Sequence, residues 1–277
     1  MVKSAVKAMD AVQAFAKQEH HEEMQKFLVT GASKRGWTTW LTGAIDPRVK
    51  AIAPMVIDML NMKAQTRWAK KVYGQQSEQI RDYTDLNLVE EIDRPGMVAL
   101  RGWVDPYSYR ERYKMPKLLL LGTNDPYWTV DSLRHYWDEL PEPKLIFQTP
   151  NAGHDLAGGK EAMQTLAAFF QMIADGRELP KMEWKIEGEG KPRLSLKVDQ
   201  QAKQIRLWSA DSADRDFRND HWTSRLLEIQ PGSSRATTVI DAPESGYRAY
   251  LGEVTLTSPT GDEYKVSTEA RDRKSVV

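Results

Sequence analysis

One short run, residues 27–37, constrains the fold of this chain most. Within it, apolar residues are followed by turn-forming residues and then by a segment typical of a helix. The residues before Ser33 are typical of a buried strand, and those after it are typical of a helix. A serine at such a break takes a strained, positive-φ conformation that projects its hydroxyl above the sheet, and its neighbours must be small. Gly31 and Ala32 meet this demand, whereas the next glycine, Gly36, comes one position later than in the G-x-S-x-G pattern. The run therefore predicts a nucleophile elbow, although an ordinary turn with a serine N-cap fits it too.

Two later apolar strands, 117–122 and 144–149, each end in a polar loop, and these loops hold Asp125 and His154. In an open parallel sheet, sites form at the carboxyl ends of the strands, so both side chains can meet Ser33. The chain order Ser, Asp, His is that of α/β-hydrolases. In such a triad the histidine removes the serine proton and the carboxylate orients the histidine. We therefore predict a catalytic triad of these three residues.

Other site residues are expected around this triad. The backbone N–H of Lys34, directly after the nucleophile, is the expected oxyanion donor, and its side chain places a positive charge near the acyl group. Asp131 is the main rival of Asp125, but a carboxylate at the start of the following helix interacts favourably with the helix dipole. Trp128 and Trp103 are the aromatic residues expected to contact the substrate. No cofactor is implied, and the five scattered histidines form no metal-ligand pattern.

Several segments of the chain resemble the PhoPQ-activated pathogenicity-related proteins, and the likeness spans nearly the whole chain. The segments that carry it are residues 31–36, 104–109, 122–128 and 150–154. This resemblance implies an α/β-hydrolase fold and the triad above. It also implies a periplasmic or secreted location for a longer parent protein, although no signal peptide opens this chain. The elbow is also similar to that of glucuronoyl esterases, which carry a cation where this chain has Lys34.

Composition excludes several classes of function. Lys plus Arg and Asp plus Glu both number 39, so the formal net charge is zero and no global field recruits nucleic acid or an anionic membrane. The chain has no cysteine, which excludes disulfides, thiolate metal sites and a cysteine nucleophile. No apolar stretch approaches the roughly 20 residues needed to span a bilayer.

The pattern of elements predicts an α/β fold followed by an all-β domain. We expect a truncated α/β-hydrolase-like parallel sheet in residues 1–178, with a helical cap insertion at about 57–115, because helix and strand alternate there. Helices are expected at 133–140 and 162–173. Residues 179–271 show short alternating strands typical of a small β-sandwich, and 272–277 are expected to be a disordered tail.

Only a short stretch precedes the elbow, so the first half of the sheet is expected to be missing. The flank of the elbow strand would then be an unpaired apolar edge, which predicts a homo-oligomer that covers it. The loop that usually supplies a second oxyanion donor would be missing as well.

We therefore expect a serine hydrolase that acts on a small-molecule or carbohydrate carboxylic ester and is weakened by the missing part of the sheet. A non-catalytic binding protein that keeps the hydrolase fold stays open as an alternative. A peptidase or amidase stays open too, because the same triad cleaves esters and amides.

Overall fold

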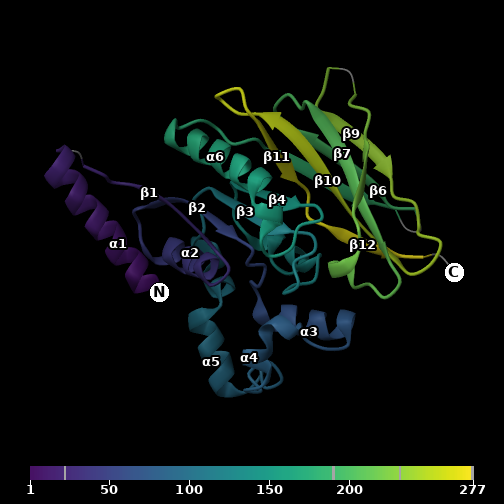
Figure 1. Ribbon diagram of the computed structural model, residues 1–277, viewed down its shortest axis with the longest axis horizontal. Helices are drawn as coiled ribbons and strands as arrows, with labels where there is room; N and C mark the ends of the chain where they lie inside the picture. The colour runs from purple at the N-terminus through teal and green to yellow at the C-terminus, as the bar shows by residue number, and fades with distance from the viewer. Residues whose placement is uncertain (22, 189–190, 231, 276–277) are drawn as a thin grey trace.

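The computed structural model describes residues 1–21, 23–188, 191–230 and 232–275, and it has two parts that pack side by side (Figure 1). The first part is a parallel sheet with helices on its faces. The second part consists of antiparallel sheets. This architecture confirms the predicted α/β class with a β-rich C-terminal part.

Four parallel strands form the first sheet, in the order β1 (Phe27–Ala32), β2 (Val49–Met55), β3 (Lys117–Gly122) and β4 (Lys144–Thr149). The apolar runs of β3 and β4 are continuous, as expected where both faces of a parallel sheet are covered. Leu118 shares an apolar cluster with Phe169 of α6 (Lys160–Ala174), whereas Leu119 shares another with Trp40 of α2 (Lys34–Ile45). Alternate side chains of a strand point to opposite faces, so α2 and α6 cover opposite sides of this sheet.

Before the sheet, α1 (Val2–Phe15) leads into η1 (Ala16–His20), and α1 packs against α2. Among the described strands β1 has one neighbour, β2, so it forms an edge of the four-stranded sheet. The predicted homo-oligomer that would cover this edge stays a prediction. None of the described helices combines the length and apolar character needed to cross a membrane.

The expected cap lies between β2 and β3, where the chain leaves the sheet and forms short helices on one side of it (Figure 1). A proline at the first position of α5 fixes a helical φ without losing a hydrogen bond, which favours the start of this helix. The elements of the cap are α3 (Met62–Tyr73), η2 (Glu78–Ile80), α4 (Arg81–Thr84), α5 (Pro95–Val104) and η3 (Pro106–Arg112).

The C-terminal part has a three-stranded and a five-stranded antiparallel sheet. The first holds β5 (Met182–Glu187), β6 (Arg193–Val198) and β9 (Arg235–Val239). The second holds β7 (Gln204–Ser212), β8 (Thr223–Leu226), β10 (Tyr247–Thr257), β11 (Glu263–Ser267) and β12 (Arg271–Lys274). This part docks beside β4, where the Gln148 backbone N–H donates to Ser267 Oγ at 2.9 Å and the Gln148 side chain accepts from the Ala270 N–H at 2.7 Å.

Two expectations about local structure are wrong. Residues 133–140 do not form one helix but two short 3₁₀ turns, η4 (Ser132–His135) and η5 (Trp137–Glu139), because Tyr136 between them leaves helical geometry at φ −157°. The expected tail is also ordered in its first part, since β12 pairs with β10 and Asp272 forms an ion pair with Arg215 at 2.6 Å. Residues 276–277 lie outside the described residues.

Candidate active site

Ser33 lies between β1 and α2 with the strained backbone expected of a nucleophile elbow. Its φ is 57° and its ψ is −123°, a conformation that an L-residue rarely adopts. The turn is held because the Ser33 N–H donates to Met55 O of the neighbouring strand at 2.9 Å. Gly36 lets α2 approach the sheet, since a Cβ there would lie 2.8 Å from Met55 O and 3.0 Å from Gly31 O. Gly36 lies one position later than the glycine of the G-x-S-x-G pattern, yet it still allows the close packing of the elbow.

Asp125 and His154 come from the loops after β3 and β4, and the structure brings them into contact. His154 Nδ1 lies 2.8 Å from Asp125 Oδ2, while the other carboxylate oxygen accepts from the Tyr127 N–H at 3.0 Å. An ionised carboxylate can only accept, so Nδ1 carries the proton and Nε2 presents a lone pair. Nε2 is buried and has no hydrogen-bond partner among the residues that the structure describes. This nitrogen is thus available as a base.

A cavity of about 480 Å³ lies beside Ser33. Ser33, Lys34, Tyr127 and Trp128 all line it. The Tyr127 ring stacks on the His154 imidazole with centroids 4.3 Å apart and planes tilted by 32°. The predicted nucleophile therefore faces a cavity whose wall also holds the imidazole in place.

The family model of the PhoPQ-activated pathogenicity-related protein matches residues 1–218. The chain belongs to this family. Autocrine proliferation repressor protein A of Dictyostelium discoideum is 35% identical to this chain, over an alignment that covers 91% of this chain and 56% of that protein. This member of the PhoPQ-activated pathogenicity-related family thus spans about half the length of that curated relative.

Similar solved structures include two acetyl xylan esterases. The enzyme from Paenibacillus sp. R4 is 17% identical, with a TM-score of 0.41 over 60% of this chain and 50% of that chain. Acetyl xylan esterase 1 from Thermoanaerobacterium sp. JW/SL YS485 is 19% identical, with a TM-score of 0.40 over 55% of this chain and 48% of that chain.

The C-terminal part holds both loops of the candidate site in this family member. Asn124, next to the acid, donates from Nδ2 to backbone oxygens around η7 (Phe217–Asn219), with a shortest distance of 2.8 Å to Asp220 O. Asn151, in the histidine loop, donates to Trp222 O at 2.9 Å and accepts from the Trp222 N–H at 2.7 Å. We call these bonds the loop clasp. They tie the acid and histidine loops to one segment, residues 217–222.

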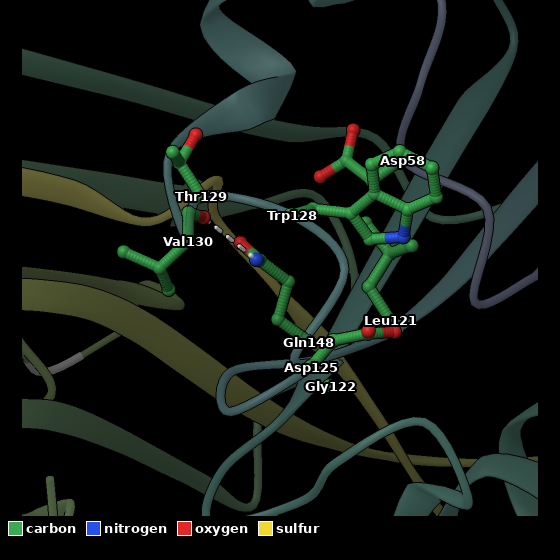
Figure 2. Close-up of a pocket in the computed structure, with 8 residues that line it drawn as sticks. All are labelled: Asp58, Leu121, Gly122, Asp125, Trp128, Thr129, Val130 and Gln148. Atoms are coloured by element: carbon green, nitrogen blue, oxygen red, sulfur yellow. Dashed lines mark hydrogen bonds between the residues drawn. The ribbon is translucent and has the colours of Figure 1, made fainter. Parts of the chain in front are cut away.

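Sequence reasoning missed Asp58, which follows β2 and lies beside Asp125, Trp128 and Gln148 around a small void (Figure 2). Its carboxyl group is fully buried and accepts a hydrogen bond from Tyr136 Oη at 2.7 Å. Burial raises the pKa of Asp58 to about 8, and the nearby Asp125 charge acts in the same direction. A lone aspartate inside the apolar run 56–60 was the signal in the sequence.

The remaining predicted residues lie in different surroundings. Lys34 is exposed along its side chain but lines the cavity, whereas the neighbouring Arg35 is exposed and does not line it. Asp131 accepts from Trp68 Nε1 at 2.9 Å and pairs with Arg134 at 2.8 Å. These bonds give Asp131 a structural role between the cap and the loop after β3.

Trp103 does not contact the candidate site, contrary to expectation. It is 72% exposed and is absent from the wall of the cavity. Helix periodicity explains this placement, because the residues of α5 that line the cavity recur every three or four positions and Trp103 falls outside this stripe. The residues of the stripe are Met97, Leu100, Arg101 and Val104.

Proposed function

We propose that this chain is a serine carboxylic-ester hydrolase in which Ser33, His154 and Asp125 form the catalytic triad. One observation carries the proposal: His154 is oriented by Asp125 at 2.8 Å and keeps a buried, unpartnered Nε2 at the same end of the sheet as the strained Ser33. A serine hydroxyl is activated when such a nitrogen takes its proton within hydrogen-bond reach, so the proposed catalysis requires Ser33 Oγ to reach His154 Nε2.

The chemistry follows from these positions. Ser33 Oγ attacks the acyl carbon while its proton passes to His154 Nε2, and the carbonyl oxygen gains the negative charge. The Lys34 N–H at the start of α2 donates to this oxyanion. The C–O bond to the alcohol then breaks, and Nε2 returns the proton to the leaving oxygen. Water repeats the sequence on the acyl-enzyme, so one ester and one water give one carboxylic acid and one alcohol.

Turnover of a p-nitrophenyl ester tests the proposal. We expect the rate of Ser33→Ala to fall until it exceeds the uncatalysed rate by no more than about 10³–10⁴-fold. This remaining acceleration is what the oxyanion hole and substrate binding provide without the nucleophile. Ser4→Ala on the exposed face of α1 is the matched control and should keep the wild-type rate. Identical rates for wild type and Ser33→Ala would instead favour the non-catalytic binding protein. Parallel assays with p-nitroanilides separate ester from amide cleavage.

A further inference from the structure

The cavity next to Ser33 extends from the elbow into the cap and is walled mainly by aliphatic side chains. Its volume of about 480 Å³ is within the range of small-molecule sites. At roughly 30 Å³ for each water-sized group, it has room for about sixteen such groups, which is enough for an acyl chain of eight to ten carbons together with its ester group. The wall includes Leu41, Ile57, Met59, Leu88, Val89 and Met97.

Polar side chains of the wall are mostly bonded to the backbone already. Thr38, Gln65 and Thr66 each donate to carbonyl oxygens, so they offer few donors to a ligand. These bonds run from Thr38 to Lys34 O at 3.0 Å, from Thr66 to Lys63 O at 3.2 Å, and from Gln65 to Leu60 O at 3.2 Å and Ser132 O at 3.1 Å. A sugar would leave hydroxyl groups without partners here, which costs free energy. A hydrocarbon chain would not.

The charges on the wall are positive. Lys34 and Arg101 line the cavity, and no aspartate or glutamate is among its described lining residues. Arg101 Nε is buried and, within the described ranges, has no hydrogen-bond partner. The cavity therefore favours an apolar ligand with a negative charge, and the carboxylate released from an apolar ester has this character.

We propose that this cavity binds the acyl chain of an apolar carboxylic ester of on the order of eight to ten carbons. The inference rests on the proposed function, because the acyl carbon must bond to Ser33 Oγ. A chain attached there begins at the wall of the cavity. Acetyl esters and polar sugar-acid esters would leave most of the apolar wall unused.

A chain-length series of p-nitrophenyl esters is the first test. Each buried methylene should raise kcat/KM about three- to fourfold. We therefore expect the octanoate ester to exceed the acetate ester by at least about 100-fold. Highest kcat/KM with acetate would overturn the acyl-chain inference while leaving the esterase function intact.

A variant pair locates the chain in this cavity. Val89→Trp fills part of the cavity, so the octanoate to acetate ratio of kcat/KM should fall at least about tenfold. Val98→Trp places the same ring on α5 at a half-exposed position away from the cavity and should keep the wild-type ratio. An unchanged ratio in Val89→Trp would mean that the acyl chain lies elsewhere, and the proposal would be wrong.

Direct binding measurements separate the claim that the cavity binds an acyl chain from the claim that the chain hydrolyses esters. Calorimetry of decanoate with Ser33→Ala should show one bound molecule per chain, and Arg101→Met should weaken this binding about tenfold, since it removes a cation from the cavity wall. No binding of decanoate to folded Ser33→Ala would overturn the cavity inference. Binding of decanoate by a wild-type chain without ester turnover would overturn the proposed function and leave the apolar ligand class standing.

Discussion

At the scale of single residues, the candidate site depends on how Asp125 differs from Asp131. Both carboxylates follow β3, but Asp125 contacts the His154 imidazole, whereas Asp131 bonds Trp68 and Arg134. The first contact fixes the tautomer that the proposed mechanism needs, and the others join the cap to its neighbouring loop.

The two acids give a direct prediction. Asp125→Asn should fold like wild type and lose about 10⁴-fold in kcat, because His154 is then held in the wrong tautomer. Asp131→Asn should lower the melting temperature and keep kcat within about tenfold of wild type, since its partners are structural. Steady-state kinetics and thermal unfolding of both variants check this. A larger loss of kcat in Asp131→Asn would exchange the two roles.

The sequence predicted Ser33, Asp125 and His154 because each stands just past a strand, and strand ends of a parallel sheet converge. It could not predict that Trp103 faces outward, because the angular position of a short helix is set by tertiary packing. The sequence did not predict Asp58 because this residue is buried by elements that are distant in the sequence, such as the segment that holds Tyr136.

At the scale of elements, the approach of α2 to the sheet depends on Gly36. A Cβ at this position would lie 2.7 Å from Ile57 Cγ2 and 2.8 Å from Met55 O. Gly36→Ala should therefore reduce the free energy of unfolding by about 2–3 kcal/mol through overpacking. Gly102→Ala in α5 is the matched control, because no atom of the described residues lies within 4 Å of its added methyl group.

Gly102→Ala should raise the unfolding free energy by up to about 1 kcal/mol, as expected for an open helical site. Urea unfolding of both variants measures the difference. Equal stability of the two variants would show that α2 does not lie this close to β2.

The loop clasp gives a second prediction for elements. Asn151 lies three residues before His154, and Asn151→Ala removes both of its bonds to Trp222. We therefore expect kcat to fall about tenfold and the free energy of unfolding to fall by about 1–3 kcal/mol. Because Asn151 has φ 57°, part of the stability loss is backbone strain. Asn87→Ala, at φ 53° in the cap, carries the same strain without the clasp and should keep the wild-type kcat.

A clasp that merely stabilises the fold would lower the unfolding free energy of Asn151→Ala while leaving kcat and its pH profile unchanged. That outcome would remove the positioning role.

Regular elements were predictable where apolar periodicity and turn residues agreed, as in β3, β4 and α6. The segment 133–140 shows the limit. Its buried residues Leu133, Tyr136, Trp137 and Leu140 follow helical spacing, yet the backbone forms two 3₁₀ turns. Strand β12 was missed because its polar residues are ordered by pairing with β10 and by the Asp272–Arg215 ion pair, which are long-range contacts.

For the whole molecule, the buried Asp58 links stability to pH. Its pKa of about 8 lies above the value of about 3.9 expected in the unfolded chain. Native Asp58 therefore keeps a proton that the unfolded chain releases, so its contribution to stability is complete below about pH 4 and is lost as pH rises through about 8. Wild type should lose stability relative to Asp58→Asn between about pH 4 and pH 8, by on the order of a few kcal/mol.

Denaturant unfolding of both chains across this range checks the sign. Asp155→Asn, at an exposed position, is the control and should follow the wild-type curve. A constant difference between wild type and Asp58→Asn at all pH values would contradict a protonated native Asp58.

The central claim is that Ser33 is an activated nucleophile. Its most direct test is labelling of the whole chain with a fluorophosphonate, followed by mass spectrometry of its peptides. We predict one phosphonyl group per chain, on Ser33, with labelling abolished in Ser33→Ala and strongly slowed in His154→Ala. Labelling that persists in Ser33→Ala, or an adduct on another residue, would contradict the account.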